Sequence, residues 1–403
     1  MTETSSDDNS PLIYLIAGEP SGDTLGALLM QGLRERTGGN IRFTGVGGPK
    51  MIEQGLESLF PMEELSVMGF VEVLPHLPNL MGRIKQTVSD VLRKRPVALI
   101  TIDSPGFCFR VAKSVGGLGI ALIHYVAPQV WAWKPGRAKK IAKYLDHILA
   151  LLPFEPAFLS RFGVASTFVG HAIVESGADQ RDGSAFRKKY DISEDASLIC
   201  ALPGSRRSET KYMIPVFGET LGVLKQSRPN VVAVVPMVPS LVKDITQGTN
   251  NWPVPTLLLE DDAEKYDAFV ASDVALAASG TVSLELAMAR TPSVIAYKVN
   301  PITAWFALRL VQVEYVNLVN ILLDRLAIPE YLQNNCTPEQ MASAINVLLD
   351  DEEAQESQKQ AYEEVLKDLG IDDERPSLRA ADVVLKIVNT YIEARKKDNT
   401  ESA

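Results

Sequence analysis

Acidic residues follow apolar, strand-like segments at two points of this chain. Asp103 ends the apolar run 98–102, and Glu19 lies in the loop that follows the run 12–17. In an open parallel sheet such loops lie at the carboxyl edge, where ligands bind. A carboxylate there can take a proton from a hydroxyl group as a general base. An Asx turn or helix cap before Pro105 explains Asp103 equally well. Our first hypothesis is an enzyme that transfers a group from a donor substrate to an acceptor substrate. In it Asp103 is a candidate base, and Glu19 is a candidate for orienting the acceptor.

Two later loops combine small residues with groups that bind phosphate. The loop 203–207 follows an apolar run and places two arginines beside a helix start, where they could stabilise a phosphate leaving group. The turn 279–281 joins a strand to a helix, and its N–H groups could cradle a diphosphate. A tight turn and an ordinary helix cap are the alternatives. The candidate donor-binding residues are Ser205, Arg206, Ser279, Gly280, Thr281 and, for ribose hydroxyls, Glu285.

The motifs of metal and dinucleotide chemistry are missing from the sequence. Neither glycine loop matches a Walker A or GxGxxG pattern, and the chain has no DxD pair and no HExxH. We therefore expect no metal and no cofactor, with arginines and helix ends stabilising the leaving group instead. The three cysteines are far apart and include no CxxC pair, which fits a reducing compartment.

Apolar runs alternate with helical patterns almost throughout the 403 residues, which is typical of βα units and parallel sheets. Strands are predicted at 12–17, 42–46, 98–102, 121–125, 147–151, 166–168, 198–202, 231–236, 256–259, 274–277 and 293–296. The pattern indicates two doubly wound, Rossmann-like domains facing a cleft. We expect an acceptor domain at 11–175, completed by a returning helix at 378–396, and a donor domain at 196–370. The polar segment 174–195 is the predicted linker.

Charge is spread unevenly along the chain. The net charge is −10, yet residues 81–143 hold twelve Lys and Arg against two Asp and Glu. A basic region on an acidic protein suits an anionic partner such as phosphate, nucleic acid or an anionic membrane, although solvated helix faces explain it as well. No nucleic-acid-binding module is recognisable, so nucleic acid is the weakest of these partners.

An apolar stretch broken by Pro75 and Pro78 spans residues 67–81. It fits either packed helices under a loop or an exposed surface for acyl chains or a membrane. Trp131 and Trp133 likewise fit a lipid interface or buried aromatic packing. The charge-free window 114–133 contains glycines and a proline, and we interpret it as strand plus loop rather than as a membrane helix. The candidate acceptor or membrane surface consists of Phe70, Val73, Leu74, Leu77, Leu80 and Met81.

Taken together, these motifs resemble the lipid-A-disaccharide synthase family over nearly the whole chain. The segments that carry the resemblance are AGEPSGD (17–23), GVGGPKM (45–51), SVMGFVEVLPHLP (66–78), HYVAPQVWAW (124–133), LPFE (152–155), FVGH (168–171), LPGSRRSE (202–209), ASGTVSLE (278–285) and YVNLVNILL (315–323). Each is weak alone, but in this order they are highly specific.

The resemblance implies a GT-B fold and an inverting, metal-independent sugar transfer. The implied donor is UDP-2,3-diacylglucosamine and the acceptor is 2,3-diacylglucosamine 1-phosphate, or lipid X. Asp103 matches the family's catalytic Asp, Glu19 the Glu of its first glycine loop, and Asn320 an Asn of its late motif, while Arg206 is expected to meet the UDP phosphates. The family also implies a homodimer, in the cytoplasm, on the inner face of the inner membrane.

One departure from the family pattern lies beside the candidate base. The family usually has Asp-Phe-Asn after Ser104-Pro105, and this chain has Gly106-Phe107-Cys108, which leaves the details of acceptor binding open. Two other interpretations remain. One is another GT-B enzyme acting on UDP-N-acetylglucosamine, either a transferase or an epimerase, and the other is a binding protein that has lost catalysis.

Overall fold

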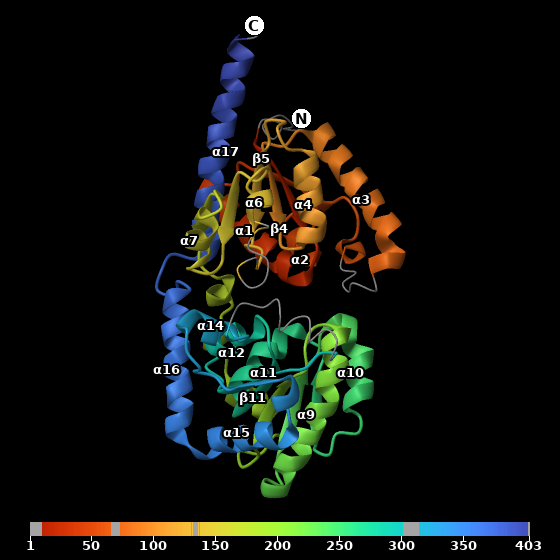
Figure 1. The fold of residues 1–403 in the computed structure, drawn as a ribbon, viewed down its shortest axis with the longest axis vertical. Helices are drawn as coiled ribbons and strands as arrows, with labels where there is room; N and C mark the ends of the chain where they lie inside the picture. The colour runs from red at the N-terminus through yellow and green to blue at the C-terminus, as the bar shows by residue number, and fades with distance from the viewer. Residues whose placement is uncertain are drawn as a thin grey trace, which may run out of the picture. The chain divides into compact units, whose positions relative to one another are not determined.

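The computed structural model describes residues 10–65, 73–129, 131, 136, 138–300 and 314–401, without the side chains at 73–77, 262 and 398–401. It divides into two compact units, residues 1–172 with 369–403 and residues 173–368. Each unit is built on one parallel sheet with helices on both faces (Figure 1). The predicted fold class is therefore confirmed.

Unit 1 contains a seven-stranded sheet with the strand order β3-β2-β1-β4-β5-β6-β7. The strands are β1 (Leu12–Ala17), β2 (Arg42–Val46), β3 (Glu57–Ser58), β4 (Ala98–Ile102), β5 (Ala121–Tyr125), β6 (His147–Ala150) and β7 (Ser166–Phe168). The helices are α1 (Pro20–Thr37), α2 (Pro49–Glu53), α3 (Val73–Lys94), α4 (Pro105–Ser114), α6 (Ala138–Ile141), α7 (Glu155–Ser160) and α17 (Pro376–Glu401), with a 3-10 turn η2 (Met62–Glu64).

Side chains of β1 alternate between two cores, one on each face of this sheet. Ile13 and Leu15 join the core formed with α1, α2 and α17, while Tyr14 and Ile16 join the core formed with α3, α4 and α6. Strands buried on both faces are near-continuously apolar, which is why the sequence located them well. Each predicted strand is present, with ends that differ by at most one residue.

Unit 2 contains a six-stranded sheet with the order β10-β9-β8-β11-β12-β13. Its strands are β8 (Leu198–Leu202), β9 (Val232–Pro236), β10 (Thr256–Leu259), β11 (Val274–Ala278), β12 (Ser293–Tyr297) and β13 (Glu330–Leu332). Its helices are α8 (Gly183–Lys189), α9 (Arg207–Ser227), α10 (Val242–Thr249), α11 (Lys265–Ala271), α12 (Val282–Met288), α14 (Leu318–Leu323), α15 (Pro338–Asp350) and α16 (Glu352–Asp368). The 3-10 turn η4 (Ala172–Glu175) joins the two units, and the 3-10 turns of unit 2 are η5 (Ala178–Gln180), η6 (Pro239–Leu241), η7 (Asp262–Glu264) and η8 (Gln333–Asn335).

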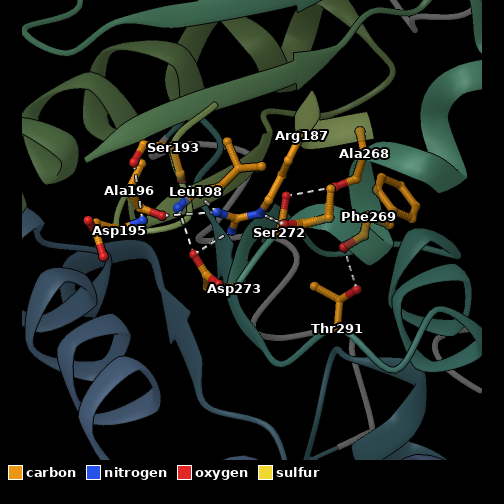
Figure 2. Close-up of polar contacts among 11 residues, drawn as sticks. Arg187, Ser193, Asp195, Ala196, Leu198, Ala268, Phe269, Ser272, Asp273 and Thr291 are labelled. Atoms are coloured by element: carbon orange, nitrogen blue, oxygen red, sulfur yellow. Dashed lines mark hydrogen bonds and ion pairs between the residues drawn. The ribbon is translucent and has the colours of Figure 1, made fainter. Parts of the chain in front are cut away.

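The predicted linker 174–195 is instead part of unit 2. It forms η5 and α8, and Arg187 of α8 donates to the carbonyls of Ala271 at 2.8 Å and of Ser193 and Ala196 at 3.2 Å. Arg187 also pairs with Asp273 at 2.9 Å, and Asp273 accepts the N–H of Leu198 (Figure 2). The Arg187 side chain thus connects this polar segment to the starts of β8 and β11. The segment was predicted to be a linker because it is polar, and its polarity did not reveal these contacts.

Candidate active site

Each sheet reverses its strand order at one point, which is where open α/β sheets bind ligands. In unit 1 this switch point lies between β1 and β4, and Ala17 pairs with Ile102 at their carboxyl ends. The loops that carry Glu19 and Asp103 therefore leave the sheet side by side. A Cβ atom on Gly18 would lie 2.5 Å from Ser104 Oγ, so the two loops are in contact.

The charges of Glu19 and Asp103 act on the same buried thiol. Burial raises the pKa of the Cys108 thiol above its ordinary range, and the two carboxylates raise it further, Asp103 more than Glu19. The structure thus brings the two predicted acidic residues of unit 1 together. Cys108, Cys200 and Cys336 are all free and buried.

The backbone that carries Asp103 has an unusual conformation. Asp103 and Ser104 have φ values of 48° and 42°, in the left-handed region that residues other than glycine seldom adopt. Ser104 is the N-cap residue of α4, yet among the described residues its Oγ finds no hydrogen-bond partner, although it is buried. Two consecutive residues in this region cost free energy, so the surrounding structure must enforce their conformation.

Asp23, at the end of the first glycine-loop motif, has a structural role that the sequence did not indicate. Its Oδ1 accepts the N–H groups of Gly48 at 2.9 Å and Met51 at 3.0 Å, and its Oδ2 accepts that of Lys50 at 2.9 Å. The N-cap residue of α2 is Gly48, which has no side chain to satisfy these donors. A side chain of α1 therefore caps α2, and two of the recognised motifs form one unit.

The switch point of unit 2 lies between β8 and β11, where Leu202 pairs with Ala277. Glu209 of α9 holds the loop after β8, because its Oε2 accepts the Ser205 N–H at 3.1 Å and its Oε1 lies 3.4 Å from Arg206 Nη1. The Arg206 side chain is 53% exposed, so it is accessible to a ligand. Burial raises the pKa of Tyr297, and the nearby Glu209 carboxylate raises it further.

The turn after β11 is anchored from both sides. The Ser279 hydroxyl donates to the Val316 carbonyl at 2.9 Å, and the Ser279 N–H donates to the Ala296 carbonyl at 3.2 Å. Gly280 and Thr281 are exposed. Thr281 is the N-cap residue of α12, but in the described part of the chain neither its side chain nor that of Ser279 makes a capping hydrogen bond.

Glu285, predicted to bind ribose hydroxyls, is paired with a lysine that the sequence analysis missed. Lys265 Nζ lies 3.1 Å from Glu285 Oε2, and both side chains are about three-quarters buried. Lys265 begins α11, twenty residues before its partner, and no motif contains both residues. The lysine neutralises the carboxylate and fixes its orientation at this edge of the sheet.

Asn320 is fully buried, and its amide is used within the protein. Its Nδ2 donates to the Ile328 carbonyl and to Glu330 Oε1, both at 2.8 Å. Its Oδ1 accepts the N–H groups of Ala327 at 2.9 Å and Ile328 at 2.8 Å. All four bonds of a primary amide are thereby made. This geometry favours a residue that positions the chain around it.

A buried carboxyl group follows β6 in the LPFE motif. Glu155 accepts the N–H of Leu152 at 3.0 Å and the indole N–H of Trp131 at 3.3 Å. Burial raises the pKa of Glu155 to about 7, and the hydrogen bonds offset only part of this shift. Trp131 packs edge-on against Phe154 with ring centroids 5.1 Å apart, which is the aromatic-packing alternative. Trp133 lies outside the described residues.

The candidate apolar surface is described only in part. Phe70 lies outside the described residues, and Val73, Leu74 and Leu77 belong to α3, which includes Pro78. The sequence predicted a break there, but the helix continues. Leu80 packs partly against the unit 1 core, whereas Met81 is 45% exposed. Among the described residues, no helix is both long and apolar enough to cross a bilayer.

Solved structures share this two-unit fold. A putative UDP-N-acetylglucosamine 2-epimerase from Listeria monocytogenes matches with a TM-score of 0.65 and 11% identity, over 96% of this chain and 97% of that one. MurG from Acinetobacter baumannii matches with a TM-score of 0.55 and 13% identity, over 93% and 99%. At such identities the likeness shows the fold alone. The fold is that of the GT-B glycosyltransferases and epimerases.

Sequence relatives are much closer. The family model for lipid-A-disaccharide synthetase matches residues 13–383. The lipid-A-disaccharide synthases of Rhodospirillum centenum and Paramagnetospirillum magneticum are 51% and 48% identical, over 96% and 95% of this chain and 98% and 99% of their own lengths. The chain belongs to the lipid-A-disaccharide synthetase family, and its activity is the glycosyl transfer that forms the lipid A disaccharide.

Proposed function

We propose that the chain transfers 2,3-diacylglucosamine from UDP-2,3-diacylglucosamine to the 6-hydroxyl of 2,3-diacylglucosamine 1-phosphate, with inversion at the sugar carbon. The observation that supports this proposal is that two acidic residues lie together at the switch point of unit 1, while Arg206 and the turn 279–281 lie at that of unit 2. An inverting transfer needs one base and a stabilised leaving diphosphate.

In the proposed reaction Asp103 acts as the general base. Its carboxylate takes the proton of the acceptor 6-hydroxyl as that oxygen forms a bond to the sugar C1 of the donor. The bond from C1 to the diphosphate oxygen breaks, and UDP leaves with the bonding electron pair. Glu19 orients the acceptor beside Asp103, because the two loops leave adjacent strands. The product is the β-1,6-linked disaccharide 1-phosphate.

The donor is proposed to bind to unit 2. Arg206 pairs with the diphosphate, and the backbone N–H groups of Gly280 and Thr281 lie on the turn beside it. The Ser205 N–H already donates to Glu209 Oε2, so Ser205 contributes through its hydroxyl group. Ser279 anchors the turn between β11 and α12, and Glu285 accepts ribose hydroxyls while Lys265 balances its charge. Asn320 acts through the chain segment that it fixes.

The membrane and the second subunit belong to the same proposal. Both substrates carry acyl chains, so we place the protein on the inner face of the inner membrane with the exposed Met81 of α3 facing lipid. Met81→Asp should reduce sedimentation with anionic phospholipid vesicles, whereas unchanged binding would remove Met81 from this surface. The family resemblance implies a homodimer, which sedimentation equilibrium measures.

The reaction is tested with purified protein, both substrates and EDTA, and the disaccharide is detected by mass spectrometry. Asp103→Asn should lower kcat by about 10²–10⁴-fold, the usual contribution of a general base. Asp382→Asn is the matched control, because Asp382 lies on α17, is exposed and pairs with Arg36 of α1. Full turnover by Asp103→Asn would remove Asp103 as the base. If the wild-type protein forms no disaccharide, the proposed reaction is ruled out.

A further inference from the structure

Glu330, on the short edge strand β13, collects three N–H donors on one carboxylate. Its Oε1 accepts the Asn317 N–H at 2.7 Å and Asn320 Nδ2 at 2.8 Å, and its Oε2 accepts the Val316 N–H at 3.1 Å. No lysine or arginine of the described residues forms an ion pair with Glu330. The carboxylate therefore uses two of its three hydrogen bonds to hold the turn 316–317. Hydrogen bonds to a charged acceptor are stronger than those between neutral groups.

The same turn holds the loop 279–281, which is proposed to bind the UDP-sugar. Val316 is bound at both ends of its backbone, because its N–H donates to Glu330 and its carbonyl accepts the Ser279 hydroxyl at 2.9 Å. Two hydrogen bonds thus connect Glu330 to Ser279, which anchors the turn between β11 and α12. The path runs from β13 to the end of β11 through Val316, which lies 14 residues from Glu330 and 37 residues from Ser279 in the sequence.

Asn317 carries a buried donor that is unsatisfied among the described residues. The residue is fully buried, and its Oδ1 accepts the Val319 N–H at 2.9 Å. Its Nδ2 is also buried, and it has no hydrogen-bond partner in the part of the chain that the structure describes. Buried amide donors are normally paired, and an unpaired one costs free energy until a ligand or water accepts its proton.

We propose that Glu330 is a positioning residue of the donor site, which holds the turn 316–317 so that Ser279 is fixed and the Asn317 amide is presented to an oxygen of the bound UDP-sugar. The inference rests on the proposed function, in that unit 2 must bind the donor. Glu330 acts only through Val316, Asn317 and Asn320. It should therefore affect donor binding and leave acceptor binding unchanged.

Glu330→Gln is the informative substitution because it conserves size. A glutamine has one acceptor oxygen and places an NH2 group against N–H donors, so at least one of the three bonds is lost. Isothermal titration with UDP should give a Kd about tenfold higher than that of the wild type. The KM for the UDP donor should rise while the KM for the acceptor stays unchanged.

The matched control is Glu339→Gln, which makes the same change in charge. Glu339 is exposed on α15 and lines the same surface cavity of about 530 Å³ as Glu330, but it accepts no N–H of the turn. Its Kd for UDP should equal that of the wild type. A purely structural role would lower the thermal midpoint of Glu330→Gln without separating the two KM values, and that result would overturn the proposal.

A second pair of variants tests the path itself. If Glu330 acts through Ser279, then Ser279→Ala and Glu330→Gln should be non-additive, and the double variant should bind UDP about as weakly as the weaker single variant. Asn317→Asp keeps the Oδ1 acceptor but removes the Nδ2 donor, and it should also weaken UDP binding about tenfold. This variant tests the proposal even if Glu330→Gln fails to fold.

Folded Glu330→Gln and Asn317→Asp proteins that bind UDP within about twofold of the wild type would overturn the inference. Failure of the proposed function is distinguishable. If the wild-type protein binds UDP but forms no disaccharide, the proposed reaction is ruled out, and the inference about Glu330 is unaffected. A wild-type protein that does not bind UDP overturns both.

Discussion

Glu155 is a carboxyl group whose surroundings oppose its charge. Two N–H donors hold its oxygens, yet burial dominates and raises its pKa from 4.5 to about 7. Between these two values the folded state binds the proton more tightly than the unfolded chain does. The stability that Glu155 contributes is therefore full below pH 4.5 and is lost as the pH rises towards 7.

Glu155→Gln should remove this pH dependence, because a glutamine stays neutral. Relative to the wild type, its free energy of unfolding should increase between pH 5 and pH 8 by up to about 3 kcal/mol. Urea unfolding at a series of pH values measures the difference. Glu35→Gln, at an exposed partner of Arg375, serves as control and should give a constant offset. A constant offset for Glu155→Gln as well would contradict the raised pKa.

The sequence could identify residues that stand directly after apolar strands, and it could not identify their partners. Asp103 and Glu19 were found because a strand followed by an acidic loop is a local pattern. Lys265 and Glu330 were missed because their partners lie in other elements, and β13 is too short to show periodicity. Asn320 came only from the family resemblance, since nothing local distinguishes a buried amide.

At the scale of elements, the prolines of α3 show how tertiary packing overrides a local signal. Pro75 lies in the first turn, where a missing N–H costs nothing. Pro78 lies further inside, where a break was predicted, yet the helix continues to Lys94. Ile84 and Val91 of α3 are buried in the unit 1 core. This burial offsets the lost hydrogen bond, and the sequence pattern around Pro78 does not reveal it.

The capping of α2 by Asp23 of α1 gives a prediction at the same scale. Asp23→Asn places an NH2 group among three N–H donors, so one or more of them loses its acceptor. The free energy of unfolding should fall by about 1–3 kcal/mol, as measured by urea denaturation. Thr24→Ala, at the next residue of α1, removes the acceptor of the exposed Lys50 ammonium group but of no backbone N–H of α2, and it should cost less. Equal losses would show that the cap contributes little.

At the scale of the whole molecule, the last helix belongs to the first unit. α17 lies against α1, and Ala380, Ala381, Val384 and Val388 join the unit 1 core (Figure 1). The approach is close at Gly32, where a Cβ atom would lie 2.5 Å from the Ser377 carbonyl oxygen. The amphipathic pattern of the sequence predicted the returning helix. The close contact depends on Gly32, and nothing in the sequence distinguishes this glycine from the others.

Gly32→Ala should destabilise unit 1 by about 1–3 kcal/mol, because the Ser377 backbone must move. Gly82→Ala on α3 is the matched control, since nothing lies within 4 Å of its added methyl group. That change should stabilise the protein by about 0.5–1 kcal/mol through helix propensity. Urea unfolding of both variants provides the test. Effects of the same sign would contradict the close packing of α1 and α17.

The separation of unit 1 into two stretches of chain affects its biosynthesis. A ribosome makes residues 1–172 first, but the helix that covers α1 is translated only after all of residues 173–368. Unit 2 is continuous and can fold once it has been made, whereas unit 1 keeps the apolar face of α1 uncovered until residues 376–401 have been translated. The domain translated first is thus completed last, and this interval is when nascent chains most need chaperone protection.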